Sequence, residues 1–419
     1  MQAKLSALLL AGTILAAAPA KAQEITVWDW KSGDPAAASY YEKVKGDFEA
    51  AHPGVTVNYV MQPLDQYYTL LGTALSSHAG PDLFLMNGGA QAKARIPALL
   101  RLDDKVADLR KTVIGWPEFT GADGGVYAVP LSIQGFVVYY DKKLYRDAGL
   151  DPDKPPRTWA DLARVCAAIK AKGAVPCFSM GNKEGYGAEF WFSTMAANEW
   201  TAGEQQDFAA GRLKWSSPQV KAILQSWVDA GKAGWFQDGP NSTTKFMDEY
   251  EGFMRGEDAN TIGLISDVAH WKQFDDFLGA DDGVFRMPSP TLAADKTEGD
   301  PMMPVAGGIG YGVNKASVHA DLAVELAKAL AAPAAMQVFF TDTGAIASNT
   351  GVDTSKVDSP AAKAILAWLK TKGVPTAHAN ATAKELEEWH RQSQLLLNGE
   401  ATVDAAAARL DAVQADARK

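Results

Sequence analysis

Two kinds of hydrophobic pattern alternate along the N-terminal part of the chain. Short apolar runs have the length of buried strands, and the segments between them repeat apolar residues at the spacing of one helix face. The strands are predicted at residues 25–30, 55–60 and 82–86, and the helices at residues 40–51 and 65–77. Apolar strands in a strand–helix–strand order predict a parallel sheet that helices cover on both faces, which is an α/β fold.

Aromatic and polar residues stand where these strands end. The sequence ITVWDWK closes the first strand on Trp30 and Lys31, and Asn87 with Gly88 stops the third. Ligands of open α/β sheets bind outside the carboxyl ends of the strands, at a switch in strand order. Trp28 lies two residues earlier, inside the strand. The pattern therefore predicts that Trp28 is core and that Trp30 faces a ligand.

A long extended run interrupts this alternation. Residues 125–141, GVYAVPLSIQGFVVYYD, would span ~55 Å at ~3.3 Å per residue, too long for one ordinary strand. We expect this run to leave one sheet and enter another, with a second crossover at residues 284–288. The expected division is a first lobe of residues 23–131 plus about 288–335, and a second lobe of residues 132–287 plus about 336–419.

Helical patterns dominate the rest of the chain. Thr158 and Asp161 form a capping-box variant at the start of a helix that Gly173 ends. Residues 175–260 are mostly helical, and a strand follows at residues 261–266. Further helices are expected at residues 320–340 and 360–372, with two more near the C-terminus.

The first residues have the form of an export signal. Lys4 precedes an apolar run at residues 5–18 that is too short to span a bilayer, and Ala20-Lys21-Ala22 has the form of a cleavage site. We expect a signal peptide over residues 1–22, cleaved after Ala22, and a soluble periplasmic protein. The net charge of −10 argues against nucleic acid or an anionic membrane as a partner.

Two cysteines and scattered histidines limit the covalent chemistry. Cys166 shares an apolar helix face, and Cys177 follows Pro176 in an extended run just after that helix. Export permits a disulfide between them, and two buried thiols are the alternative. The six histidines include no pair at i,i+4 spacing, so no metal site and no cofactor are expected.

The remaining motifs favour binding over catalysis. GGIGYG at residues 307–312 matches neither the Walker A pattern nor a clean G-x-G-x-x-G pattern, and a glycine turn that lets backbone approach a ligand is favoured over phosphate binding. Trp30, Trp191, Trp235 and Trp271 lie near strand ends or loops, and aromatic rings among amides and carboxylates suit a sugar. Two cleft carboxylates could instead form the acid–base pair of a glycosidase. The charged run ELEEWHRQ at residues 385–392 is predicted to be a solvated helix face.

Several motifs together resemble one family. They are GPDLFLMNGG at 80–89, GVYAVPLSIQGFVVYYDKKLYRDAGL at 125–150 followed by PPRTWADL, FMRGEDANTIG at 253–263, PVAGGIGYGVNK at 304–315 and LLLNGEATVDAAA at 395–407. In order and spacing they resemble the extracellular solute-binding proteins of ABC importers, which include maltose- and other sugar-binding proteins. The resemblance implies the two-lobe periplasmic-binding-protein fold of type II, with the ligand cleft between lobes joined by crossover segments.

The resemblance also implies ligand-binding positions in loops of both lobes. By position these are Trp30, Lys31, Asn87, Gly88, Gln134, Glu189, Trp191, Asp267, Trp271, Gly307 and Gly308. Maltose-type proteins often carry a tryptophan or a charged pair after PDLF, whereas this chain has Met86, Asn87 and Gly88 there. That difference suggests a smaller or differently shaped glycoside than a maltodextrin.

The expected function is therefore carbohydrate binding without catalysis. A monomeric periplasmic protein would capture a mono- or small oligosaccharide by closing its lobes, through a hinge at residues 131–135 and 284–288, and deliver it to the membrane permease. The same fold could instead bind a polyol, an anionic sugar derivative or a polyamine. Lys31 is the candidate cation for an anionic ligand. A secreted glycosidase is the third possibility.

Overall fold

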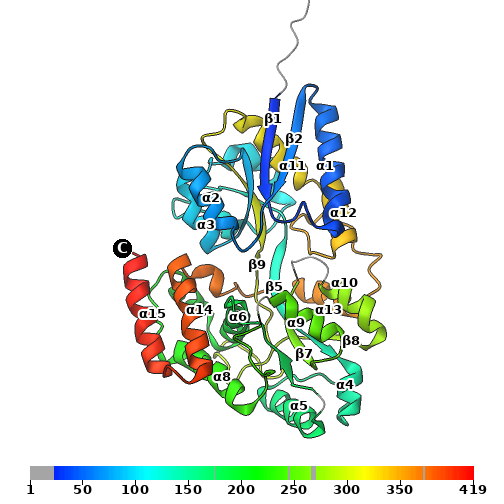
Figure 1. The fold of residues 1–419 in the computed structure, drawn as a ribbon, viewed down its shortest axis with the longest axis vertical. Coiled ribbons are helices and arrows are strands. Elements are labelled where there is room, and N and C mark those ends of the chain that lie inside the picture. The colour runs from blue at the N-terminus through cyan, green and yellow to red at the C-terminus, as the bar shows by residue number, and fades with distance from the viewer. Residues whose placement is uncertain (1–22, 174, 244–245, 266–269, 371–372) are drawn as a thin grey trace, which may run out of the picture.

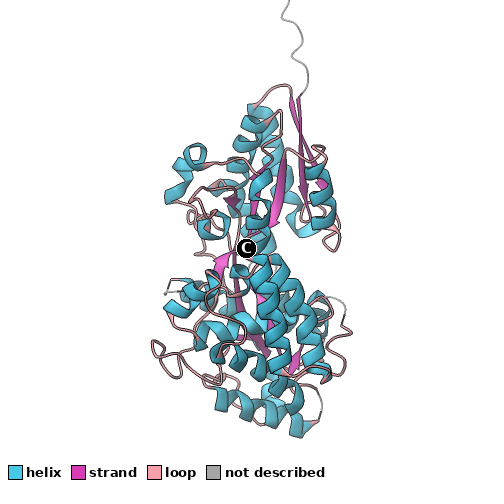
Figure 2. Ribbon diagram, turned by 90° about the vertical axis from the view of Figure 1, so that its left-hand side faces the viewer, coloured by secondary structure: helices cyan, strands magenta, loops and turns pink. Residues whose placement is uncertain are grey.

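The computed structural model describes residues 23–419 apart from 174, 244–245, 266–269 and 371–372. The expected signal peptide and Asp267 lie outside the described residues. The described chain forms two α/β lobes, one above the other in Figure 1, and each lobe is built on its own five-stranded sheet. In the view turned by 90°, helices flank the strands of both lobes (Figure 2).

The first lobe contains the N-terminal sheet. Its strands, in spatial order, are β2 (Val55–Met61), β1 (Gln23–Asp29), β3 (Leu83–Asn87), β10 (Ile309–Val313) and β4 (Val129–Pro130). The expected parallel pairing is confirmed for β1 with both β2 and β3, whereas β10 runs antiparallel to β3 and to β4. The carboxyl ends of β1 and β3 therefore meet at one edge of the sheet, as the strand pattern predicted.

Helices cover this sheet. They are α1 (Ala38–Ala51), α2 (Tyr67–Ser76), α3 (Ala90–Arg95), α11 (Ala320–Leu330) and α12 (Pro333–Thr343). The single helix expected at residues 320–340 is wrong, because Pro333 begins a new helix after a bend of 55°. Within the described residues no single helix is long and apolar enough to cross a membrane, and the bent pair α11–α12 reaches that threshold only as a pair.

The second lobe has a mixed sheet. Its strands are β6 (Phe178–Ser179), β7 (Asn260–Leu264), β5 (Ile133–Asp141) and β8 (Asp282–Phe285), with β9 (Val305–Gly307) pairing with the start of β5. The crossover expected at residues 284–288 is wrong. β8 pairs antiparallel with β5 inside this sheet, and Met287 is buried in the core of the same lobe.

Helices also pack around the second sheet. They are α4 (Lys142–Asp147), α5 (Trp159–Lys172), α6 (Tyr186–Glu199), α7 (Ala202–Ala209), α8 (Pro218–Ala233), α9 (Phe246–Met254), α10 (His270–Leu278), α13 (Pro360–Leu369), α14 (Ala383–Asn398) and α15 (Val403–Ala417). As predicted, the Thr158 hydroxyl caps α5 by accepting a hydrogen bond from the Asp161 amide, and Gly173 ends that helix in the left-handed conformation.

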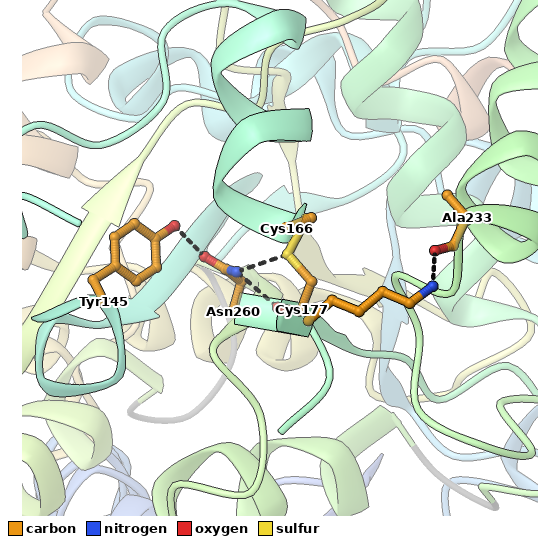
Figure 3. Close-up of a disulfide and its surroundings, with 6 residues drawn as sticks. Tyr145, Cys166, Cys177, Ala233 and Asn260 are labelled. Atoms are coloured by element: carbon orange, nitrogen blue, oxygen red, sulfur yellow. Dashed lines mark hydrogen bonds between the residues drawn. A yellow bond between two sulfur atoms is a disulfide. The ribbon is translucent and has the colours of Figure 1, made fainter. Parts of the chain in front are cut away.

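The expected disulfide is present between Cys166 of α5 and Cys177, which precedes β6 (Figure 3). The amide of Asn260 donates to the Cys177 carbonyl over 2.7 Å, and the Tyr145 hydroxyl donates to the Asn260 side-chain oxygen over 2.7 Å. The bridge therefore ties α5 to a hydrogen-bonded layer that includes the neighbouring strand β7.

Three chain segments connect the lobes and are bonded to one another. The Leu131 amide donates to the Ile309 carbonyl over 2.8 Å, and the Ile133 amide donates to the Ile346 carbonyl over 2.8 Å. Leu131, Ile309 and Ala345 belong to the first core, whereas Ile133, Met303 and Ile346 belong to the second. We therefore propose that the later crossings lie near residues 303–309 and 345–346, and not near 288 and 335.

Candidate functional site

A cavity of about 350 Å³ lies between the lobes. The first lobe lines it with Trp30, Lys31, Leu64, Tyr68, Asn87, Gly88, Ala90, Gln91, Gly308 and Ile309. The second lobe and the first crossing line it with Gln134, Tyr186, Glu189, Phe190, Leu264, His378, Ala379, Ala383, Leu386, Glu387 and His390. The wall thus combines aromatic rings with amides, carboxylates and imidazoles, and seven predicted site residues meet in it.

Trp30 reaches the cavity because the chain turns sharply after β1. One carboxylate oxygen of the buried Asp29 accepts hydrogen bonds from the amides of Lys31, over 2.7 Å, and Ser32, over 2.6 Å. The Trp30 ring is half-buried and meets the edges of Tyr67 and Tyr68 at centroid distances of 4.8 and 6.2 Å. Trp30 is therefore a supported ring at a strand end.

Trp28 is less enclosed than the pattern predicted. It is half-buried and packs at the margin of a small core cluster around Tyr67 and Phe84. Of the two tryptophans only Trp30 lines the cavity, and its contact with a ligand stays a prediction.

Lys31 brings a cationic group to the first-lobe wall. Its side chain is 6% exposed, and burial lowers the pKa of its ammonium to about 8, an effect that Asp34 and Asp29 oppose. Lys31 is thus closer to losing its proton near neutral pH than an exposed lysine.

Glycines bring the strand ends together beneath the cavity. The Gly88 amide donates to the Gly308 carbonyl over 2.7 Å, and a side chain at Gly88 would lie only 2.5 Å from the Gly307 carbonyl oxygen. Gly308 lines the cavity as predicted. Gly307 does not: it packs against Gly115 and donates its amide to Glu118 over 2.8 Å. Gly307 therefore serves backbone packing at the crossing, and of the pair Gly307 and Gly308 only Gly308 is available to a ligand.

The second-lobe wall centres on Glu189 of α6. Its side chain, 6% exposed, lies 2.5 Å from Nε2 of His390 on α14 and 4.0 Å from Nε2 of His378. Burial alone would raise the pKa of Glu189, but His390 beside it holds that pKa below its ordinary value. Burial lowers the pKa of His378, whereas the pKa of His390 is raised because Glu189 outweighs the effect of burial.

Besides Gly307, three predicted site residues are not among the described residues that line the cavity. Trp191 is wrongly predicted, because it is fully buried in the second-lobe core and its indole N–H donates to the Ser226 hydroxyl over 3.0 Å. Trp271 falls in α10, but its side chain lies outside what the structure describes, so its place in the site stays a prediction. Asp267 lies outside the described residues. Trp235, considered as a further aromatic, is also core.

The solvated face predicted at residues 385–392 is right only in part, because Glu387 and Arg391 are exposed but other residues of the run are not. Leu386, Glu387 and His390 line the cavity, while Trp389 and Glu385 are fully buried. Tyr68 and Tyr186 were also missed. Arg95 holds the Tyr68 ring at 4.2 Å, and the Tyr186 ring lies 6.0 Å from that of His390.

Two sequence signals pointed to these residues. Tyr68 lies in the first turn of the helix after the second strand, and His390 follows the only tryptophan of a strongly amphipathic C-terminal helix. From the sequence alone, however, neither signal shows whether the polar face of the helix meets the cavity or bulk water. Among the described residues, no group of three His, Cys, Asp or Glu side chains is arranged to hold a metal ion.

Two α/β lobes joined by three segments, with a polar and aromatic cavity between them, define a two-lobe ligand-binding protein. Residues 31–337 match the family described as "Bacterial extracellular solute-binding protein". The chain belongs to that family.

Individual proteins show the same relationship. The sn-glycerol-3-phosphate-binding periplasmic protein UgpB of Brucella abortus is 30% identical over 129 residues, 29% of this chain and 28% of that protein. An ABC transporter extracellular-binding protein of Pyrococcus horikoshii is 27% identical over 240 residues, 52% of this chain and 55% of that protein. The chain spans about half the length, or less, of the curated relatives that it matches.

Solved structures confirm the type II two-lobe fold. A "Chitin oligosaccharide binding protein" superposes with a TM-score of 0.82 at 22% identity, covering 94% of this chain and 98% of the other. A maltose-bound MalE3 of T. maritima superposes with a TM-score of 0.76 at 19% identity, covering 94% and 100%.

Proposed function

We propose that this protein is the periplasmic carbohydrate-binding subunit of an ABC importer, which captures a mono- or small oligosaccharide between its lobes and delivers it to the permease. The observation that carries the proposal is the composition of the interlobe cavity. Trp30 and Tyr68 offer ring faces or edges to the apolar C–H surface of a sugar. Asn87, Gln134 and Glu189 offer amides and a carboxylate to its hydroxyls.

The charges around the cavity favour a neutral ligand. Lys31 and His390 are balanced by Glu189 and Glu387, and no arginine is among the described residues that line the wall. Phosphate recognition usually relies on arginine forks or clustered backbone amides. The site therefore supports a neutral sugar better than the phosphate-bearing ligand named for the UgpB relative.

The cavity volume supports a small ligand. About 350 Å³ lies near the lower end of the ~300–1,000 Å³ typical of small-molecule sites. A mono- or short oligosaccharide fits that range, and a long maltodextrin does not.

The wall is poorly suited to glycoside hydrolysis. A general acid needs a raised pKa, but the pKa of Glu189 is lowered beside His390. Ser193 bonds Nδ1 of His378 over 2.8 Å, yet its side chain is fully buried and lies behind the wall. These features favour a binding protein over a secreted glycosidase.

The proposal is tested by calorimetric titration of the purified protein with a defined panel. The panel contains N,N′-diacetylchitobiose, xylobiose, maltose, tagatose and stachyose, with sn-glycerol 3-phosphate as the anionic comparator. We expect saturable binding of at least one neutral sugar, and weaker or absent binding of the phosphate ester. Binding of the phosphate ester alone would contradict the proposal, and release of product from the sugars would favour the glycosidase.

Lobe closure gives a second expected result. The three bonded crossings near residues 131–133, 303–309 and 345–346 are the segments about which the lobes can rotate. Small-angle scattering should show a smaller radius of gyration when the sugar identified by calorimetry is saturating. An unchanged radius with full occupancy would argue against a clamp.

Trp30→Ala should weaken sugar binding by about 1–3 kcal/mol, the range found for a base stacked on an aromatic side chain. The ring is half-buried at a turn, so the fold should survive its removal. Calorimetric titration together with thermal melting checks both parts of this prediction. Wild-type affinity combined with a much lower melting temperature would show that the ring is structural.

A further inference from the structure

The second-lobe wall holds a carboxylate whose surroundings are built to keep it charged. Glu189 is 6% exposed, yet its two oxygens face two imidazoles from different elements of the fold. A buried carboxylate without a cationic partner would take up a proton, because burial penalises its charged form. His390 supplies that partner at 2.5 Å.

The positions of both histidines are fixed by specific neighbours. A Cβ at Gly185 would lie 2.2 Å from Cγ of His390, so only glycine leaves room for this imidazole. The Ser193 hydroxyl lies 2.8 Å from Nδ1 of His378 and also accepts the backbone amide of His378 over 3.2 Å. These two contacts to Ser193 fix the orientation of the His378 ring, whose Nε2 faces Glu189.

Other charged and titratable groups also face His390. Glu387 lies near His390 on the same helix, α14. Glu184 lies near it from the segment before α6, and Glu189 belongs to α6 itself. His378 and Tyr186 complete the same wall, and Lys31 and Tyr68 lie across the cavity in the first lobe. Carboxylates thus outnumber cations around His390, and Glu189 is the one in direct contact with it.

We propose that Glu189 and His390 form the specificity-determining ion pair of the binding site: Glu189 is kept as a pure acceptor for ligand hydroxyls, and the wall selects neutral polyhydroxy ligands over anionic ones. This proposal rests on the proposed function. It adds that the ligand presents hydroxyl groups to the wall formed by α6 and α14. An ionised carboxylate has only acceptor sites, so it pairs with hydroxyl donors and repels phosphate or carboxylate.

The pair also makes binding depend on pH. The His390 contribution is present below its ordinary pKa and is lost as the pH rises through its raised pKa. The Glu189 contribution is present above its ordinary pKa and is lost as the pH falls through its lowered pKa. Sugar affinity should therefore be flat between about pH 4.5 and 6.5, with an acid limb below the lowered pKa of Glu189 and a basic limb above the raised pKa of His390.

The test compares His390→Gln with a matched control. His52 and Glu325 form a second histidine–glutamate pair, at 2.8 Å, on the surface of the first lobe and away from the cavity. His390→Gln should lower affinity for the best-bound sugar of the panel about tenfold at pH 6, or 1.4 kcal/mol. Its acid limb should move to higher pH, because Glu189 loses its counter-ion. His52→Gln should bind as the wild type does.

Two further measurements separate specificity from folding. Glu189→Gln should lose sugar affinity and narrow the preference for sugar over sn-glycerol 3-phosphate, with little change in thermal melting. Proton NMR of the ligand-free protein should show His390 titrating above about 6.5 in the wild type and below it in Glu189→Gln, where burial acts without a carboxylate.

The outcomes show separately whether the ion-pair proposal fails and whether the proposed carbohydrate-binding function fails. If no sugar of the panel binds the wild type, the carbohydrate function fails and the sugar selectivity fails with it. If a sugar binds but His390→Gln and Glu189→Gln bind it with wild-type affinity and pH profile, only the ion-pair proposal is overturned. A His390 ring that titrates below 6.5 in the wild type would overturn it without any ligand.

Discussion

Trp191→Ala is expected to lower the free energy of unfolding by about 3–5 kcal/mol, the cost typical of truncating a buried aromatic ring. The Trp191 ring is fully buried and lies within 5.7 Å of the rings of both Trp227 and Phe236, and 6.1 Å from Trp159. Its removal leaves a cavity that these large rings cannot readily collapse into. Urea unfolding followed by circular dichroism measures the loss.

Two further variants serve as controls for this measurement. Trp191→Phe keeps one six-membered ring and loses the five-membered ring with its hydrogen bond to Ser226, so it should cost clearly less than the alanine variant. Trp30→Ala, a tryptophan at the cavity, should do the opposite and affect binding more than stability. If Trp191→Ala unfolds as the wild type does but loses sugar binding, the ring reaches the ligand and the core assignment is wrong.

The first-lobe part of the site could be predicted because it depends on local chain geometry. In a parallel sheet the ends of neighbouring strands lie at one edge, so Trp30 and Asn87 are brought together by strand order alone. The order of strands and helices follows from periodicity, which the sequence displays directly. The bend at Pro333 was missed, because the apolar pattern continues across it.

The second-lobe part could not be predicted in the same way. Helix α6 is buried at every position from Gly187 to Glu199, so its sequence has almost no polar face to show which side meets the cavity. Glu189 and Phe190 face the cavity while Trp191 faces the core. One residue of displacement rotates a helical side chain by about 100°, and this decides between a ligand contact and a core position.

Helix α14 shows the complementary ambiguity. Its hydrophobic stripe and charged face are typical of a helix that packs on a core and exposes its other side to water. Here that charged side borders the cleft, so His390 and Glu387 meet the cavity, and Glu385 is fully buried beside Trp215 and Arg418. Amphipathicity reports that a face is polar. Only the position of the other lobe decides whether that face meets bulk water or a ligand.

The disulfide can be removed without disturbing the cavity, and its loss should cost about 2–3 kcal/mol of unfolding free energy. Cys166 and Cys177 are 11 residues apart, and closing a loop of that length restricts the unfolded chain by roughly this amount in the chain-entropy model. Neither cysteine lines the interlobe cavity. A Cys166→Ala/Cys177→Ala variant should therefore unfold at lower urea concentration and bind sugar as the wild type does.

Reduction of the wild type supplies a test without any substitution. Urea unfolding in dithiothreitol should move the wild-type midpoint toward that of the double variant, while the double variant itself should not respond to the reductant. Thiol titration of the denatured, unreduced wild type should find no free thiol, since the two cysteines of the chain are paired. Two titratable thiols, or a midpoint that dithiothreitol leaves unchanged, would show that the bridge does not stabilise this lobe.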